Sequence, residues 1–198
     1  MTNIVVMVSG NGSDLQSVID GINNGKIDGK IMLVISSRSG VYAEQRALLC
    51  NIPYEVYERR NYSSGEEMFS KIESRLIEVK AELIVLAGYI SIIPNSIVNR
   101  FRGRIINIHP SLIPKHCGKG YYGLKVHQSV IDSGDKESGV TIHFVNEDAD
   151  NGQIIYQEKV CVNENDSAET LQARILEVEH RILPIIVSSL CDEIKKTQ

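Results

Sequence analysis

Hydrophobic and polar residues alternate in blocks along the first half of the chain. Short continuous apolar runs at residues 4–8, 31–35 and 83–87 are typical of strands that are covered on both faces of a sheet, and residues 54–57 and 105–108 also have the pattern of short strands. Between these runs, apolar residues recur at helical spacing over residues 14–22, 42–49 and 66–80, and Pro94 fits the first turn of a helix that ends near residue 101. This repeated alternation predicts an α/β fold with helices on both faces of the sheet.

The pattern changes after about residue 115. We predict a helix over residues 124–133, strands over 141–145 and 154–162, and a closing helix from 168 to about 190. Two consecutive strands without a helix between them indicate an antiparallel C-terminal edge on a Rossmann-like, open and mostly parallel sheet. The sequence has no repeats, low-complexity tracts or obvious linkers, so we expect one domain over residues 1–198.

Charge and cysteine usage narrow the possible partners. The formal net charge is -4, whereas a protein that binds nucleic acid usually carries a basic excess, so we expect no nucleic-acid partner. No apolar stretch approaches the roughly 20 residues that span a membrane, so we expect no membrane partner. The four cysteines form no CxxC pair and no metal-ligand spacing, which favours free thiols, no metal and a cytoplasmic location.

A glycine-rich turn, Ser9-Gly10-Asn11-Gly12-Ser13, joins the first predicted strand to the first predicted helix. Main-chain N–H groups at a helix N-terminus attract an anion, and glycines let a phosphate approach closely. The turn lacks the third glycine of a dinucleotide site and the Lys-Ser/Thr pair of a P-loop. A plain strand-to-helix turn, capped by Ser13 or Asp14, is the alternative interpretation, and this motif alone leaves both open.

The segment Asn107-Ile108-His109-Pro110-Ser111 follows the last strand of the parallel series. Strand alternation places Asn107 and His109 on one side while Ile108 points into the core. Open α/β sheets bind ligands in the crevice beyond the carboxyl ends of their strands. An amide donor beside an imidazole can stabilise an oxyanion and carry a proton, although a lone histidine at a strand end is often structural.

An acidic loop covers residues 146–152 and includes Asp148 and Asp150. One of these carboxylates would orient His109 and stabilise its charged form, or the loop is simply a solvated turn. Sequence spacing does not choose between the two acids. His143 alternates with apolar neighbours, so we interpret it as a structural histidine.

Together with Leu86-Ala87-Gly88-Tyr89 and the segments 107–114 and 139–152, these motifs resemble the folate-dependent formyltransferase family over nearly the whole chain. The resemblance implies a Rossmann-type fold whose half at about 1–100 binds phosphate and whose half at about 101–198 carries folate binding and catalysis. The implied reaction is direct transfer of the formyl group of 10-formyltetrahydrofolate to the amine of phosphoribosylglycinamide in de novo purine biosynthesis.

Residue by residue, the resemblance implies a catalytic trio of Asn107, His109 and Asp150, in which Asp150 raises the pKa of His109. It also implies a glycinamide contact at Glu179 and phosphate binding by Gly12, Ser13 and Asp14. The implied folate-binding residues are Ile90, Ser91, Ile92, Ile93, Asn107, Val145 and Asp148. The expected partners are these two small molecules, no metal is implied, and we expect a monomer or homodimer.

Three departures from the family pattern bear on binding. Position 14 is Asp where Asn is usual, and a carboxylate beside a phosphate is unfavourable unless it points away or caps the helix. Gly65 and Ser91 stand where arginine is common around the folate. The loop at residues 117–124 looks longer than usual and lies next to His109 in the sequence, where it would cover the site or alter amine specificity.

Related activities remain as alternatives. A sugar-nucleotide N-formyltransferase uses the same trio but usually has added C-terminal elements. A formyltetrahydrofolate hydrolase normally has an extra N-terminal regulatory domain, and methionyl-tRNA formyltransferase has a second, basic domain. A non-catalytic folate or nucleotide sensor belongs to a different class, and it would have no need of the trio.

Overall fold

The computed structural model describes residues 1–197, in which seven strands form one sheet of order β3-β2-β1-β4-β5-β6-β7. The strands are β1 (Thr2–Val8), β2 (Gly29–Ser36), β3 (Tyr54–Val56), β4 (Leu83–Leu86), β5 (Ile105–His109), β6 (Glu137–Phe144) and β7 (Ile154–Cys161). Strands β1 to β5 pair in parallel, and β6 and β7 pair antiparallel to their neighbours. The predicted open, mostly parallel sheet with an antiparallel C-terminal edge is confirmed.

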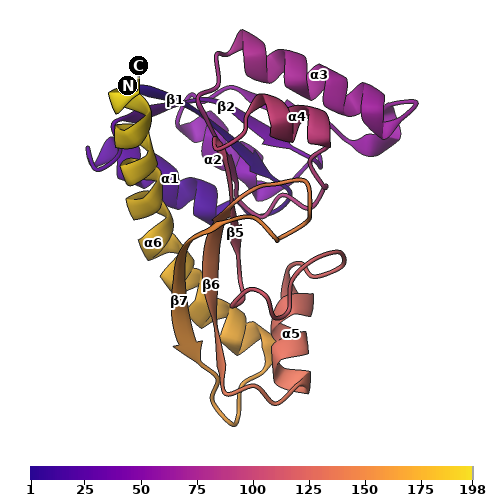
Figure 1. The fold of residues 1–198 in the computed structure, drawn as a ribbon, viewed down its shortest axis with the longest axis vertical. Helices are drawn as coiled ribbons and strands as arrows, with labels where there is room; N and C mark the ends of the chain where they lie inside the picture. Colours follow the sequence, from indigo (N-terminus) through magenta and orange to yellow (C-terminus); the bar gives the residue numbers. More distant parts are fainter. Residues whose placement is uncertain (198) are drawn as a thin grey trace.

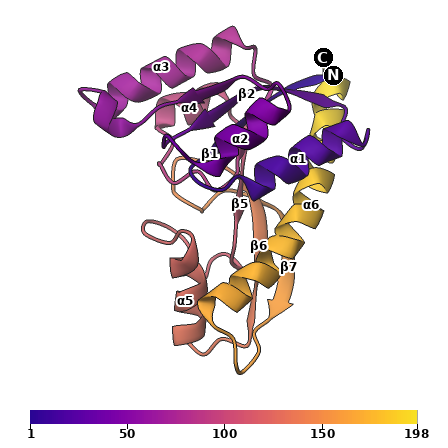
Figure 2. The ribbon, with the colours of Figure 1, turned by 180° about the vertical axis from the view of Figure 1, so that it is seen from behind.

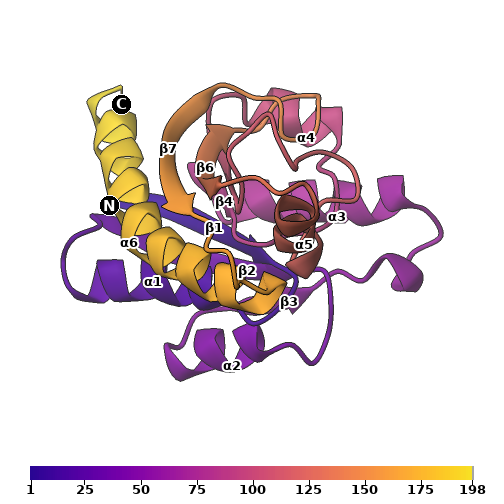
Figure 3. The same cartoon turned by 90° about the horizontal axis from the view of Figure 1, so that it is seen from below.

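Helices cover both faces of this sheet (Figures 1 and 3). The apolar cluster on one face includes buried residues of α1 (Ser13–Asn23), α2 (Tyr42–Leu49), α5 (Leu124–Asp132) and α6 (Ala168–Lys196). The opposite cluster includes buried residues of α3 (Gly65–Glu78) and α4 (Asn95–Arg100). Each helix presents one apolar stripe to the sheet, as the helical spacing predicts. A short 3-10 helix at Arg59–Asn61 is an element that the sequence pattern did not indicate.

β6 and α6 are among the elements that are longer than predicted. β6 begins at Glu137 because residues 137–140 pair with β7, and a Cβ at Gly139 would lie only 2.1 Å from the carbonyl oxygen of Glu158. α6 continues to Lys196 although Pro184 lies inside it. Its buried residues pack against both α1 and α5, and Figure 2 shows it running the length of the molecule to end beside the N-terminus. Long-range packing, rather than local sequence, sets both lengths.

The topology brings three loops to one edge of the sheet. Strand order reverses between β1 and β4, so the segments that follow these two strands flank the crevice where open α/β sheets bind ligands. The segment after β5 lies next to them. Within residues 1–197, no helix is long and apolar enough to cross a membrane.

Candidate active site

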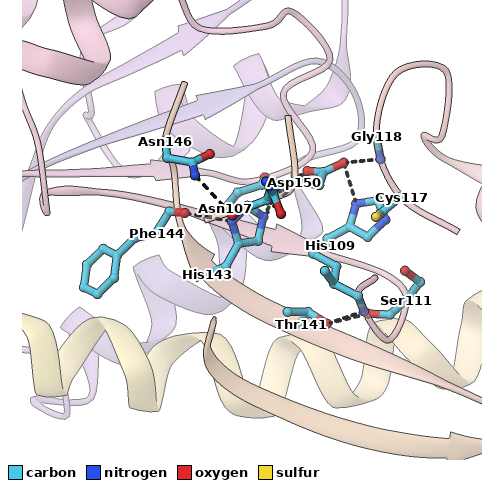
Figure 4. A network of polar contacts seen from close by, with 12 residues as sticks. Asn107, His109, Ser111, Cys117, Gly118, Thr141, His143, Phe144, Asn146 and Asp150 are labelled. Atoms are coloured by element: carbon cyan, nitrogen blue, oxygen red, sulfur yellow. Dashed lines mark hydrogen bonds and ion pairs between the residues drawn. The ribbon is translucent and has the colours of Figure 1, made fainter. Parts of the chain in front are cut away.

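The end of β5 carries two polar side chains toward this crevice. Ile106 and Ile108 belong to the apolar cluster on the α1 and α6 face, so Asn107 and His109 face the other side of the sheet. The β5–β6 register places Asn107 directly opposite His143, and their side chains meet with the Asn107 Nδ2 atom 3.2 Å from His143 Nε2 (Figure 4). The predicted alternation at this strand end is therefore confirmed.

Asp150 approaches Asn107 and His109 from the loop after β6. Its Oδ1 accepts a hydrogen bond from Asn107 Nδ2 at 3.2 Å, and its Oδ2 lies 3.8 Å from His109 Nδ1. The Oδ2 atom also accepts a hydrogen bond of 2.8 Å from the main-chain N–H of Gly118 (Figure 4). Asp148 is exposed to solvent instead. Of the two acids that spacing left open, the structure brings Asp150 to His109.

Local geometry explains how the loop reaches the strand end. Asp150 has a left-handed backbone with φ of 53°, and Gly152 follows it. A Cβ atom at Gly152 would lie 1.6 Å from the carbonyl oxygen of Phe144, so only glycine permits this return toward β6. The side chain of Asn146 donates to the carbonyl of Asn151 across the loop at 3.1 Å. The loop thereby holds Asp150 over the end of β5.

Burial decides the charge state of His109. The residue is 4% exposed, and this desolvation lowers the pKa of its imidazole below the ordinary value. The charge of Asp150 and the carbonyl of His116 act in the opposite direction, and His143 adds to the lowering. The expectation that Asp150 raises the pKa of His109 is confirmed for that pair, although burial outweighs this contribution and the net pKa of His109 is lowered.

Hydrogen bonding also assigns the proton of the neutral His109 ring. The Nε2 atom lies 2.9 Å from the carbonyl oxygen of His116. Because a carbonyl only accepts hydrogen bonds, Nε2 carries the proton. Nδ1 is then the basic nitrogen, and it faces Asp150.

Asp150 remains ionised in this setting. Burial acts to raise the pKa of its carboxyl, but His143, His109 and the Gly118 N–H together hold that pKa below the ordinary value. The sequence pattern placed His143 as a structural residue, yet the structure puts it inside the site. It was missed because only the β5–β6 register shows that His143 lies opposite Asn107. We call Asn107, His109, His143 and Asp150 the catalytic cluster.

Both amide hydrogens of Asn107 are engaged within the catalytic cluster. The ring of His143 donates from Nδ1 to the carbonyl of Phe144 at 2.9 Å, which leaves Nε2 free to accept from Asn107. The second hydrogen goes to Asp150. The amide is therefore fixed in orientation, with its NH2 group directed at the centre of the cluster.

The glycine-rich turn has the geometry of an open helix N-terminus. Gly12 is the N-cap of α1 with φ of 74°, and a Cβ there would lie 2.8 Å from Ala43 Cβ on α2. Within the described residues, no side chain caps α1, so the alternative in which Ser13 or Asp14 caps the helix is not what the structure shows. Arg46 holds the turn by donating to the carbonyl and side-chain oxygens of Asn11 at 3.0 and 2.8 Å.

The side chain of Asp14 does not cap α1 but points toward α6. Its Oδ1 lies 3.8 Å from His180 Nε2, and among residues 1–197 neither atom has a hydrogen-bond partner. Burial raises the pKa of Asp14 to about 7. Burial and the neighbouring Asp14 likewise raise the pKa of Glu179 well above its ordinary value. We call Asp14, Glu179 and His180 the turn cluster.

The predicted folate segment follows β4. Ile90 and Ile92 are 39% and 59% exposed, whereas Ile93 is buried in the core with residues of α3 and α4, and Ser91 is half-buried. The Ile90 N–H donates to Ser9 Oγ at 3.0 Å, which ties this segment to the glycine-rich turn. Among the remaining predicted folate residues, Val145 is half-buried and Asp148 is exposed. Their contact with folate stays a prediction.

Fold and site together are those of an α/β enzyme with a buried His–Asp–Asn arrangement at a strand end. The Formyl transferase family model matches residues 2–187, so the chain belongs to the formyl transferase family and is an enzyme of the transferase class.

The chain is 43% identical over 187 residues to the phosphoribosylglycinamide formyltransferase of Haemophilus influenzae, covering 94% of this chain and 86% of that protein. Among solved structures, it is similar to glycinamide ribonucleotide transformylase 1 of Symbiobacterium toebii, with a TM-score of 0.92, 35% identity, and coverage of 98% and 89%. A formyltetrahydrofolate deformylase of Pseudomonas syringae pv. tomato is 26% identical with a TM-score of 0.87, over 97% of this chain and 62% of that one.

Proposed function

We propose that this enzyme transfers the formyl group of 10-formyltetrahydrofolate to the amine of phosphoribosylglycinamide, a step of de novo purine biosynthesis. The observation that carries the proposal is the catalytic cluster, which brings Asn107, His109 and Asp150 within hydrogen-bonding or ion-pairing distance. Support for the acceptor comes from the likeness to a phosphoribosylglycinamide formyltransferase over 94% of the chain.

In the proposed reaction the amine nitrogen attacks the formyl carbon, and negative charge develops on the formyl oxygen. The basic Nδ1 of His109 takes a proton from the attacking amine, and Asp150 stabilises the imidazolium that forms. Asn107 exchanges its hydrogen bond to His143 for one to the oxyanion, a contact that contributes roughly 3 kcal/mol in comparable sites. His109 then returns the proton to the folate nitrogen as the carbon–nitrogen bond breaks.

The turn beside Gly12 is the proposed phosphate site. The uncapped N–H groups of α1 provide an anion site. The Asp at position 14 is compatible with this role because its pKa near 7 leaves the carboxyl partly protonated at neutral pH. Ser13 and Asp14 complete the site, and Glu179 is assigned to the glycinamide end. The exposed Ile90 and Ile92 provide an apolar surface for the folate.

We further infer a cytoplasmic location, since all four cysteines are free thiols. The proposal involves two small-molecule substrates, no nucleic acid and no metal, and it holds for a monomer or a homodimer.

The test is an assay of the purified chain with 10-formyltetrahydrofolate and three acceptor conditions: phosphoribosylglycinamide, an amino-sugar nucleotide, and no acceptor. We expect formylated phosphoribosylglycinamide and little formate. Preference for the amino-sugar nucleotide would identify a sugar-nucleotide formyltransferase, and formate release without an acceptor would identify a hydrolase. Folate binding without turnover under any condition would favour a sensor.

The pH dependence of turnover gives a second measurement. His109 acts as a base in the proposed reaction, and its pKa is lowered. Turnover should therefore be constant around neutral pH and fall only when the pH drops below about 6.5, the ordinary histidine pKa. A turnover number that instead falls as the pH rises through neutrality would contradict a neutral His109 base.

A further inference from the structure

The loop between β5 and α5 contacts both His109 and Asp150 of the catalytic cluster. The carbonyl oxygen of His116 lies 2.9 Å from His109 Nε2, and the N–H of Gly118 donates to Asp150 Oδ2 at 2.8 Å. Figure 4 shows the Gly118 contact beside His109 and Asp150. Both contacts use main-chain atoms two residues apart. The backbone conformation of residues 116–118 therefore sets the hydrogen bonds of His109 and Asp150 together.

His116 has an unusual backbone conformation in this loop. Its φ is 51°, in the left-handed region that is unfavourable for a residue other than glycine. Such a conformation persists only where the surrounding structure holds it. The side chain of His116 is 12% exposed, and Ser111 also holds the loop by donating from its Oγ to the carbonyls of Lys115 and His116 at 2.7 and 3.3 Å.

The imidazole of His116 is hydrogen-bonded on both sides. Its Nδ1 lies 2.8 Å from the Ser129 hydroxyl on α5, and its Nε2 lies 3.0 Å from Asp135 Oδ2 in the segment that follows α5. Lys115 also binds both oxygens of Asp135 at 3.0 Å. α5 packs against α6, so these contacts connect the loop to a helix of the core.

We propose that His116 is a positioning residue for the formyl transfer. Its side chain, held by Ser129 and Asp135, places its carbonyl against His109 Nε2. That contact keeps the proton of neutral His109 on Nε2 and leaves Nδ1 as the base beside Asp150. The expected effect on turnover rests on the proposed function, but the tautomer of His109 is a property of the protein alone and is measured without substrate.

The test uses the full chain labelled with 15N and records imidazole 1H–15N correlations near pH 7.5. The His109 signals are assigned by their loss in His109→Asn. In the wild type we expect the Nε2-protonated tautomer. In His116→Asn, which tolerates the left-handed backbone but lacks the imidazole, we expect a mixture of tautomers. Its kcat should fall about 10-fold or more while the KM values for both substrates stay within about twofold, because the substrate contacts are retained.

Ser129→Ala is the milder variant, and Gln128→Ala is its matched control. Ser129→Ala removes one hydroxyl that bonds the His116 ring, whereas Gln128 is exposed on the same helix and donates to Asp132 instead. We expect Ser129→Ala to shift the His109 signals and lower kcat by roughly threefold, and Gln128→Ala to change neither.

Three results would overturn the proposal: a wild-type His109 protonated on Nδ1, wild-type His109 signals and kcat in a folded His116→Asn, or unchanged His109 signals in Ser129→Ala. If His116→Asn does not fold, as judged by thermal unfolding, Ser129→Ala decides by the same readouts. If the wild type does not formylate phosphoribosylglycinamide but His109 changes tautomer in His116→Asn, the proposed function fails and the positioning role stands.

Discussion

The catalytic cluster and the turn cluster both consist of buried and half-buried polar residues, but they differ in how their polar atoms are paired. In the catalytic cluster, Asp150 receives two hydrogen bonds and both amide hydrogens of Asn107 are engaged. In the turn cluster, the facing Asp14 and His180 atoms have no hydrogen-bond partner within residues 1–197. The paired acid keeps a pKa below the ordinary value, whereas the pKa of the unpaired acid is raised to about 7. Burial is common to both, and hydrogen bonding decides the sign of the shift.

This difference in pairing indicates that the two clusters have different functional roles. The catalytic cluster is organised before substrate arrives, as expected for groups that stabilise developing charge. The turn cluster has unsatisfied groups beside an open helix N-terminus, and such groups gain partners when a ligand binds. Variants in the catalytic cluster and in the glycine-rich turn should therefore separate effects on turnover from effects on substrate binding.

The largest expected effect follows from breaking the catalytic cluster. His109→Asn removes the base, and Asp150→Asn removes the charge that stabilises its protonated form. Each should lower kcat by about 10²–10⁴-fold, with thermal unfolding near that of the wild type. Glu147→Gln, in the same loop but paired with Arg102 on the surface, is the control and should retain turnover. Near-normal turnover in both His109→Asn and Asp150→Asn would sink the assignment of these residues.

Gly12→Ala should be the next largest effect and should act on binding. The substitution forces a side chain into a left-handed position and into contact with Ala43. We expect the KM for phosphoribosylglycinamide to rise about 10- to 100-fold, with a smaller change in kcat, as the turn shifts away from the phosphate. Gly10→Ala is a matched control because a Cβ at Gly10 meets nothing within 4 Å. Equal KM values for the two variants would argue against a phosphate site at Gly12.

The raised pKa of Asp14 predicts a pH-dependent stability. Folded Asp14 holds a proton up to about pH 7, whereas its ordinary pKa is 3.8. The unfolded chain therefore releases this proton first, so the free energy of unfolding falls as the pH rises from about 4 to about 7. Glu179, with a raised pKa, contributes in the same direction, and His180, 3.8 Å from Asp14, has a pKa that burial and the charge of Arg46 lower.

Asp14→Asn removes the contribution of Asp14 to the pH dependence of the free energy of unfolding. We expect the variant to be more stable than the wild type by about 1–3 kcal/mol at pH 8 and by little near pH 4. Urea unfolding at several pH values measures the difference, and the exposed Asp20→Asn on the same helix is the control. A stability difference that does not grow with pH would show that Asp14 ionises normally.

Arg46→Ala should have the smallest effect. Arg46 donates to Asn11 through two nitrogens, and its loss loosens the turn without altering Gly12. We expect a KM for phosphoribosylglycinamide that is a few-fold higher and an unchanged kcat, measured beside the exposed Arg38→Ala. A reduced kcat with unchanged KM would indicate that Arg46 acts on the catalytic cluster instead.

Much of the fold was predictable because its signals are local. Buried strands appear as continuous apolar runs and surface helices as a period near 3.6, so the alternation of elements and the bounds of α2 followed directly from the sequence. The start of β6 and the far end of α6 were less predictable. Pairing with β7 and packing against α1 determine them, and these partners are distant in the sequence.

The sequence by itself determined that a glycine-dependent turn joins the first strand to the first helix. It also determined that Asn107 and His109 lie on the same side of the sheet. Both features depend on backbone geometry over a few residues. The family resemblance already favoured Asp150, but only the tertiary structure showed its contact with Asn107, placed His143 opposite Asn107, and brought the His116 carbonyl to His109. It also buried His109 enough to lower its pKa despite the opposing charge of Asp150, and it turned Asp14 toward α6. Desolvation and hydrogen-bond distances arise from segments that meet only in the folded chain, and local periodicity carries no information about them.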